Sequence, residues 1–192
     1  MNIDEFAAKF AGHDLVRARP SAMKVLHLSV TNTWGNRTLS TDSPEWKKLR
    51  EEVLKRDDYK CRFCGIRATS WMVVDHMNGV ASENNLWNLG VNCQMCDRIR
   101  HCGLAGMKGL LMLGTSSMPQ VDIVRRTRDY VKEHRKIPKA VQIATDAKPV
   151  DEMKIVDFAN ILLETDWERL PSRMKNYRGF FTGKFDRWQV EA

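Results

Sequence analysis

Two closely spaced cysteine pairs limit what this chain can fold into more than any other feature of its sequence. Cys61 pairs with Cys64, and Cys93 pairs with Cys96, each in a Cys-x-x-Cys arrangement. Two such pairs can supply four thiolates at tetrahedral spacing, which is the ligand set that structural zinc prefers. The sequence therefore predicts a zinc centre held by these four cysteines. The alternative is a redox Cys-x-x-Cys motif, which needs a βαβ context that is missing from this sequence.

The size and composition of the chain predict a soluble protein of the cytoplasm. Its 192 residues, 43% of them hydrophobic, can bury one core with extensions around it. No apolar run reaches the ~20 residues of a membrane-spanning helix, and residues 1–30 lack the apolar core of a signal peptide. Cytoplasmic thiols stay reduced, which favours metal binding over disulfides. The fifth cysteine, Cys102, is expected to be a small buried residue.

Hydrophobic periodicity divides the chain into three parts and predicts an α+β fold. Residues 1–43 form an N-terminal arm followed by a strand over residues 24–30, where polar and apolar side chains alternate. Residues 44–108 form the zinc-binding domain. It opens with a helix that runs to about Arg56, preceded by Ser43 as a hydroxyl N-cap. Residues 109–192 form a mainly helical extension.

The C-terminal extension is expected to contain two helices, over residues 118–135 and 151–165. Residues 137–149 hold two prolines and show no clear period, so they are expected to form a linker. One face of the first helix is apolar and should turn inward. The opposite face is basic and should turn outward, with Arg125, Arg126, Arg128 and Lys132.

A second metal site is possible beside the cysteines. Residues 65–92 separate the two pairs, which is more than the ~15 to 20 residues of a simple zinc ribbon, so they should form a structured unit. A strand over residues 71–74 would place Asp75 at its end. Asp97 and His101 are four residues apart and would share one face of a helix. These three side chains could surround Mg²⁺ or Mn²⁺, and the imidazole also tolerates Zn²⁺ or Ni²⁺.

Each of these residues also has an ordinary structural explanation. The dipeptide Asp75-His76 could be a hydrogen-bonded or solvent-facing pair. Asp97 could favour a helix N-terminus through its charge. His101 could be a surface residue.

The order and spacing of these residues resemble the HNH endonuclease family, whose fold is a treble-clef, ββα-metal unit. The resemblance covers about residues 46–101. The matching residues are Trp46, Leu49, Arg50, Val53, Leu54, Arg56, Asp57, Cys61, Cys64, Gly65, Val74, Asp75, His76, Asn88, Leu89, Cys93 and Cys96.

The resemblance implies metal-dependent hydrolysis of DNA phosphodiester bonds, which is the leading function expected from the sequence. His76 would then be the general base that activates water, and Asn88 would brace the catalytic loop. Asp75, with one or both of Asp97 and His101, would hold the catalytic divalent cation. The family more often has His or Asn at position 97, and a carboxylate there changes the metal preference.

A second resemblance covers more of the chain and implies a different role. The chain is similar to the DotN (IcmJ) family. This similarity implies a zinc-bearing, HNH-like adaptor on the coupling ATPase of type IVB secretion systems. The residues that carry this similarity are Leu26, Leu28, Ser29, Val30, Trp34, Arg56, Asp57, Tyr59, Cys61, Phe63, Cys64, Gly65, Asn84, Asn85, Asn88, Leu89, Leu170, Pro171, Ser172, Arg173 and Trp188. Such an adaptor needs only the four cysteines. Members of this family tend to lose the Asp-His pair, which this chain keeps.

The net charge of +7 and the pI near 9.3 favour an anionic partner such as DNA. Much of this charge lies in a basic, aromatic C-terminal tail. Its candidate binding residues are Arg173, Lys175, Arg178, Lys184 and Arg187, interleaved with Tyr177, Phe180, Phe181, Phe185 and Trp188. Basic residues neutralise phosphates and aromatic rings stack on bases, but the same residue types form protein interfaces. The tail could also simply dock on the core.

Overall fold

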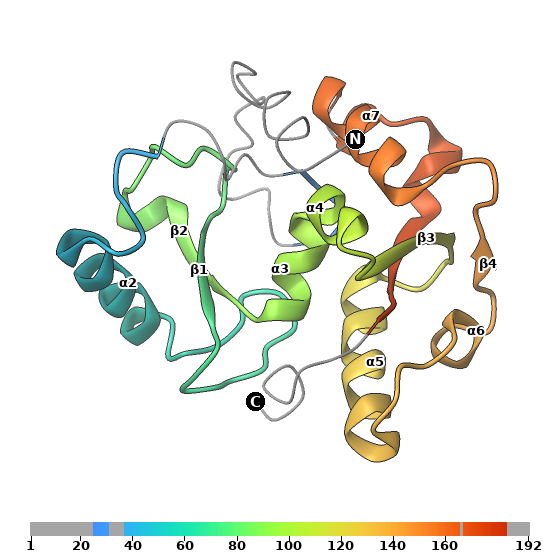
Figure 1. The fold of residues 1–192 in the computed structure, drawn as a ribbon, viewed down its shortest axis with the longest axis horizontal. Helices are drawn as coiled ribbons and strands as arrows, with labels where there is room; N and C mark the ends of the chain where they lie inside the picture. Colours follow the sequence, from blue (N-terminus) through green and yellow to red (C-terminus); the bar gives the residue numbers. More distant parts are fainter. Residues whose placement is uncertain (1–24, 31–36, 166, 184–192) are drawn as a thin grey trace.

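The chain forms a mixed α+β structure with two small sheets, and the computed structural model describes residues 25–30, 37–165 and 167–183 (Figure 1). The expected α+β class is confirmed. The elements in chain order are α2 (Pro44–Arg56), β1 (Val73–His76), the 3₁₀ turn η2 (Leu86–Asn88), β2 (Leu89–Asn92), α3 (Gln94–Arg100), α4 (Cys102–Met107), β3 (Leu111–Thr115), α5 (Gln120–His134), α6 (Ala140–Ile143), β4 (Lys148–Pro149), α7 (Ile155–Glu164), η3 (Trp167–Arg169), η4 (Ser172–Asn176) and β5 (Tyr177–Phe181).

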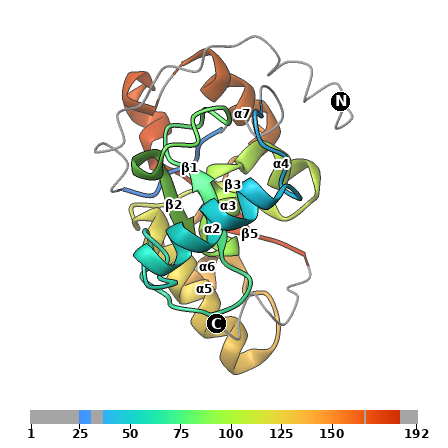
Figure 2. The same cartoon turned by 90° about the vertical axis from the view of Figure 1, so that its left-hand side faces the viewer.

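Helix α2 begins and ends where its sequence predicts. The Ser43 hydroxyl accepts a hydrogen bond from the backbone N–H of Trp46, and Pro44 occupies the first helical position. The helix buries Val53 and Leu54, and burial of such side chains contributes ~1.5–3 kcal/mol each. Figure 2 shows α2 crossing in front of strands β1 and β2.

Strands β1 and β2 form an antiparallel hairpin, which is followed directly by α3. The register pairs Val73 with Asn92 and His76 with Leu89. The strand begins later than the sequence predicts because Trp71 has a positive φ of 63° and interrupts the extended backbone. The shift places Asp75 and His76 within β1 rather than beyond its end.

The C-terminal extension contains a three-stranded sheet as well as helices. Strand β3 lies in the middle and pairs antiparallel with both β4 and β5. The linker expected over residues 137–149 contains α6 and β4. It is ordered by packing, because Ile143 and Ala147 join a buried cluster with Ile123 and Phe180.

The strand predicted over residues 24–30 is wrong for its described part, residues 25–30, which belongs to neither sheet. Its backbone bonds to helix ends instead: the N–H of Ser29 donates to the carbonyl of Ile99, and its carbonyl accepts from the N–H of Cys102. These two bonds satisfy groups that a helix end leaves unpaired. The predicted N-terminal arm lies outside the described residues.

One hydrophobic cluster joins the N-terminal segment, the cysteine region and the C-terminal extension. It includes Leu28, Val53, Ile99 and Phe158, all fully buried. Gly179 in β5 permits a close approach, because a Cβ there would lie 3.0 Å from side-chain atoms of both Leu28 and Ile99. Within the described residues, no helix combines the length and the apolar character needed to cross a membrane.

Candidate metal centres and their surroundings

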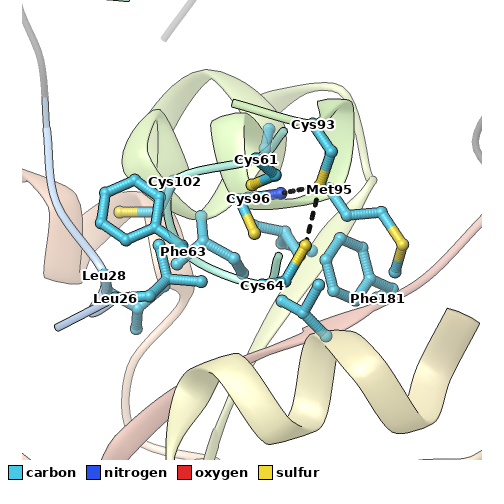
Figure 3. Close-up of a cluster of buried hydrophobic side chains, with 14 of the residues drawn as sticks. Leu26, Leu28, Cys61, Phe63, Cys64, Cys93, Met95, Cys96, Cys102 and Phe181 are labelled. Atoms are coloured by element: carbon cyan, nitrogen blue, oxygen red, sulfur yellow. Dashed lines mark hydrogen bonds between the residues drawn. The ribbon is translucent and has the colours of Figure 1, made fainter. Parts of the chain in front are cut away.

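The four paired cysteines converge in the core. All four are buried, and their sulfur atoms lie within 4.8 Å of one another (Figure 3). The Sγ atoms of Cys64 and Cys93 are 3.6 Å apart, and none of the cysteines forms a disulfide. Zinc–sulfur bonds of about 2.3 Å in a tetrahedron place the sulfurs about 3.8 Å apart. The cluster therefore has the donor atoms and the spacing to hold a structural zinc ion.

Two local structures bring these sulfur atoms close together. A tight turn holds the first pair: the N–H of Cys61 donates to the carbonyl of Ile66, and Gly65 closes the turn with a φ of 78°. Cys93 is the N-cap of α3, and its Sγ accepts from the N–H of Cys96 at 3.5 Å. The fifth thiol, Cys102, lies outside the cluster, and burial raises its pKa to about 12.

Helix α5 adds a charged side chain that the sequence analysis placed wrongly. Arg128 is buried rather than on the outer face, and its guanidinium Nη2 donates to the Sγ atoms of Cys64 and Cys93, both at 3.2 Å. Burial acts to lower the pKa of Arg128, but the charge on Cys93 and Cys64 outweighs it and raises that pKa. Residue spacing gave a usable signal, because Arg128 continues the apolar stripe of Val124 and Val131.

The cysteines of the cluster differ in their pKa shifts: hydrogen bonds with Cys61 and Cys64 raise the pKa of Cys93, whereas the pKa of Cys64 is lowered. Hydrogen bonds with Cys61, Cys93 and Cys96, together with the positive charge of Arg128, hold the pKa of Cys64 far below its ordinary value. A depressed thiol pKa favours the thiolate, which is the form that binds metal.

The second predicted group of ligands also comes together. One ligand atom from each of Asp75, Asp97 and His101 lies within 4.8 Å of the others. The Nε2 atom of His101 is 3.5 Å from an Asp97 oxygen and 3.8 Å from an Asp75 oxygen. Burial acts to lower the pKa of His101, but the two carboxylates outweigh it and raise that pKa. The donor set is one that a hard divalent cation accepts.

A buried arginine already faces this group. The Nε atom of Arg100 lies 2.9 Å from the Oδ2 atom of Asp75, and the two side chains are 1% and 6% exposed. Arg100 also donates to the carbonyl of His76 at 2.9 Å. The sequence analysis did not single out Arg100, because its charge at the end of α3 resembles that of a solvent-facing residue. Asp75 thus has a cationic partner from the protein itself.

His76 and Asn88 are placed differently from each other. His76 is half-buried, its Nε2 lies 3.0 Å from Oδ1 of Asn84, and its ring stacks on Trp46 with centroids 5.8 Å apart. Asn88 is fully buried. Its side chain accepts from the N–H of Asn78 and donates to the carbonyl of Glu83, so it braces the loop between β1 and β2.

The second group opens into a cavity of about 580 Å³. Asp75, His76, Asp97 and His101 line one part of it. Four basic residues also line it: Arg37, Arg50, Arg98 and Lys108. The cavity could therefore accept an anionic group beside a cation.

The described part of the C-terminal tail is docked on the core. Tyr177, Phe180 and Phe181 are buried in β5, where they cannot stack on bases. The guanidinium of Arg178 donates to the carbonyls of Met118, Lys175 and Tyr177, and burial lowers its pKa.

The other candidate binding residues of the tail have varied positions. Arg173 is exposed, and the half-buried Lys175 lies 3.9 Å from a carboxylate oxygen of Glu168. Lys184 and Arg187 lie outside the described residues. The described aromatic residues of the tail therefore support the third alternative, in which the tail docks on the core.

Comparison with known proteins adds one distant similarity. No protein-family model matches the chain. The chain is 25% identical over 81 residues to the type 4 apparatus protein DotN of Legionella pneumophila subsp. pneumophila strain Philadelphia 1. The matched segment covers 41% of this chain and 38% of DotN, so the chain spans well under half the length of that relative. The similarity supports the second resemblance drawn from the sequence.

Proposed function

We propose that this chain is a non-catalytic, zinc-stabilised, HNH-like adaptor of a type IVB secretion or conjugation coupling complex, where it binds the coupling ATPase from the cytoplasmic side. The observation that carries the proposal is the 81-residue similarity to the type 4 apparatus protein DotN. The buried four-cysteine cluster supports it, because an adaptor of this kind needs a stable zinc centre and no catalytic group.

The fold that we propose for this centre is the treble-clef, ββα-metal unit. The hairpin of β1 and β2 followed by α3 supports it, since the second cysteine pair lies at the start of that helix. Cys61, Cys64, Cys93 and Cys96 would hold the zinc ion, which supplies a structural crosslink when bound. The segments 1–43 and 109–192 would be extensions of this unit.

The pairing of Asp75 with Arg100 argues against the catalytic alternative. The carboxylate that would bind a divalent cation is 5% exposed and in an ion pair with a buried guanidinium. A cation placed beside it would be repelled by Arg100 unless that side chain moved. Moving Arg100 would break its buried ion pair with Asp75, which costs several kcal/mol.

The second candidate function is metal-dependent hydrolysis of DNA. The observation that favours it is the convergence of Asp75, Asp97 and His101 at a cavity lined by basic residues. A bound divalent cation would stabilise charge on the phosphate. His76 would take the proton from water as the general base.

One paired experiment separates the two functions. The full chain is co-expressed with the coupling ATPase of its own secretion system and purified through a tag on the ATPase. We expect the chain to co-purify in the wild type and in His76→Ala, and to be lost in Cys96→Ser, because only the zinc centre is required.

The same preparations are incubated with plasmid DNA and Mg²⁺, Mn²⁺ or Ni²⁺. We expect no cleavage above that of His76→Ala. Cleavage that the wild type performs and His76→Ala lacks, together with failure to co-purify, would overturn the adaptor proposal in favour of a nuclease.

A further inference from the structure

Arg128 reaches the cysteine cluster from a distant part of the chain. It lies on α5, in the C-terminal extension, and is 6% exposed. Its Nη2 atom is 3.2 Å from the Sγ atoms of both Cys64 and Cys93, so it bridges the two Cys-x-x-Cys pairs. The neighbouring Arg125 donates through Nε to the carbonyl of Cys64 at 3.2 Å. Figure 3 shows the helix α5 running beside Cys64.

The burial of this arginine needs an electrostatic explanation. The Nε atom of Arg128 is buried and has no hydrogen-bond partner among the described residues. A buried guanidinium with an unsatisfied N–H is costly, and an apolar side chain of similar length would fill the same space without that cost. The two sulfur contacts are the interactions that offset it. Zinc bound to four thiolates carries a net charge of −2, which a buried cation in contact with two sulfurs partly neutralises.

We infer that Arg128 is a positioning residue for the zinc centre, and that it makes zinc retention and the docking of α5 depend on each other. The guanidinium stabilises the thiolates that hold the metal, and the metal-bound thiolates supply the charge that allows the guanidinium to stay buried. Such coupling is reciprocal: whatever α5 contributes to zinc affinity, zinc contributes equally to the docking of α5. The inference does not rest on the proposed adaptor role.

The first test measures zinc retention in the full zinc-loaded chain. Arg128→Met keeps an unbranched, flexible side chain, although a shorter one, and removes the charge and the N–H groups. The matched control is Arg126→Met on the same helix, where the exposed side chain donates to the carbonyl of Ile143 instead. In competition with a chromogenic chelator, we expect Arg128→Met to bind zinc ~10–100-fold more weakly. Arg126→Met should match the wild type.

A spectroscopic readout distinguishes contact with the sulfurs from general packing. The zinc is replaced by Co²⁺, whose sulfur-to-metal charge-transfer band reports the electron density on the thiolates. Loss of an N–H donor raises that density, so Arg128→Met should shift the band to longer wavelength. Arg128→Lys, which keeps the charge, should give a smaller shift. An unchanged band and unchanged zinc affinity in Arg128→Met would overturn the inference.

The contribution of the sulfur contacts to the docking of α5 is tested by amide hydrogen exchange on the wild type and Arg128→Met, both zinc-loaded. Loss of the sulfur contacts should raise exchange across α5 while α2, which holds neither of the cysteines that Arg128 donates to, keeps its protection. Equal protection of α5 in both proteins would overturn the coupling. If Arg128→Met fails to fold, Arg128→Lys is compared with Arg126→Lys in all three measurements. The same outcomes then support or overturn the inference.

Discussion

Two clusters of potential metal ligands share helix α3, and the protein surrounds them with opposite electrostatic arrangements. The first consists of Cys61, Cys64, Cys93 and Cys96. Its arginine, Arg128, donates to two of the four sulfur atoms, Cys64 Sγ and Cys93 Sγ. The second consists of Asp75, Asp97 and His101. Its arginine, Arg100, lies directly on a carboxylate oxygen that a metal would bind.

The difference shows how the position of one buried cation changes what a ligand cluster can do. A guanidinium that donates to cysteine sulfurs lowers the cost of gathering negative charge and so favours metal binding. The guanidinium of Arg100 neutralises the negative charge of Asp75 from within the protein, and a divalent cation must compete with it. The same fold can therefore favour a cation at one ligand cluster and disfavour it at the other.

The largest difference between the clusters is expected from loss of a single ligand of the cysteine cluster. Zinc binding contributes ~10 kcal/mol or more in small metal-dependent folds, which is comparable to the whole stability of a domain. Cys61→Ala should therefore lose bound zinc and its cooperative thermal transition. Cys102→Ala, which removes the thiol outside the cluster, should keep one zinc per chain. A normal melting profile for Cys61→Ala would refute the structural role of zinc.

A smaller but distinctive effect is expected from removal of Asp75. Asp75→Ala leaves Arg100 buried without its partner and should lower the free energy of unfolding by ~3–5 kcal/mol. Asp97→Asn, whose side chain is 21% exposed, serves as the matched control and should cost under ~1 kcal/mol. Urea unfolding measures both. If Asp75→Ala is as stable as the wild type, the ion pair of Asp75 with Arg100 does not stabilise the fold.

The protonation of His101 offers a further test of how the second cluster differs from the cysteine cluster. Its pKa is raised in the folded protein, so the protonated ring stabilises the fold. That contribution is fully present below the ordinary pKa of about 6.5 and is lost as the pH rises through the higher folded value. NMR titration of the imidazole should give a raised pKa, and Asp97→Asn should bring it down. A fall in the wild-type pKa on addition of Mn²⁺ or Mg²⁺ would instead indicate a cation at this site.

The smallest effect is expected at His76. This side chain is half-buried and is held by Asn84 and Trp46, so His76→Ala should change the free energy of unfolding by under ~1 kcal/mol. Thermal unfolding with zinc bound measures the change. A loss comparable to that of Asp75→Ala would mean that His76 belongs to the structural network around Arg100.

Local signals in the sequence predicted the elements that depend on their own residues. Helix α2 follows from the N-cap Ser43 and the proline after it, and α5 and α7 follow from their apolar periodicity. The cysteine cluster follows from the spacing of its two pairs, because four soft ligands have few other uses in one core. Among the candidate ligands, Asp97 and His101 follow from their spacing of four residues, and Asp75 follows from its place beside an expected strand.

The tertiary structure decided features that depend on a distant partner. Strand β5 exists because β3 supplies the hydrogen bonds and the core buries its aromatic residues, which as a sequence resemble an exposed basic tail. Residues 25–30 lie against the ends of α3 and α4 instead of joining a sheet.

The same distinction applies to the two arginines. Sequence identifies Arg100 and Arg128 as charges, but only the packing of helices reveals that one neutralises Asp75 and the other bridges two thiols. The physical reason is that the free energy of a buried charge depends on which groups surround it. The sequence therefore determined which residues are candidate ligands, and the fold decided which charges surround them.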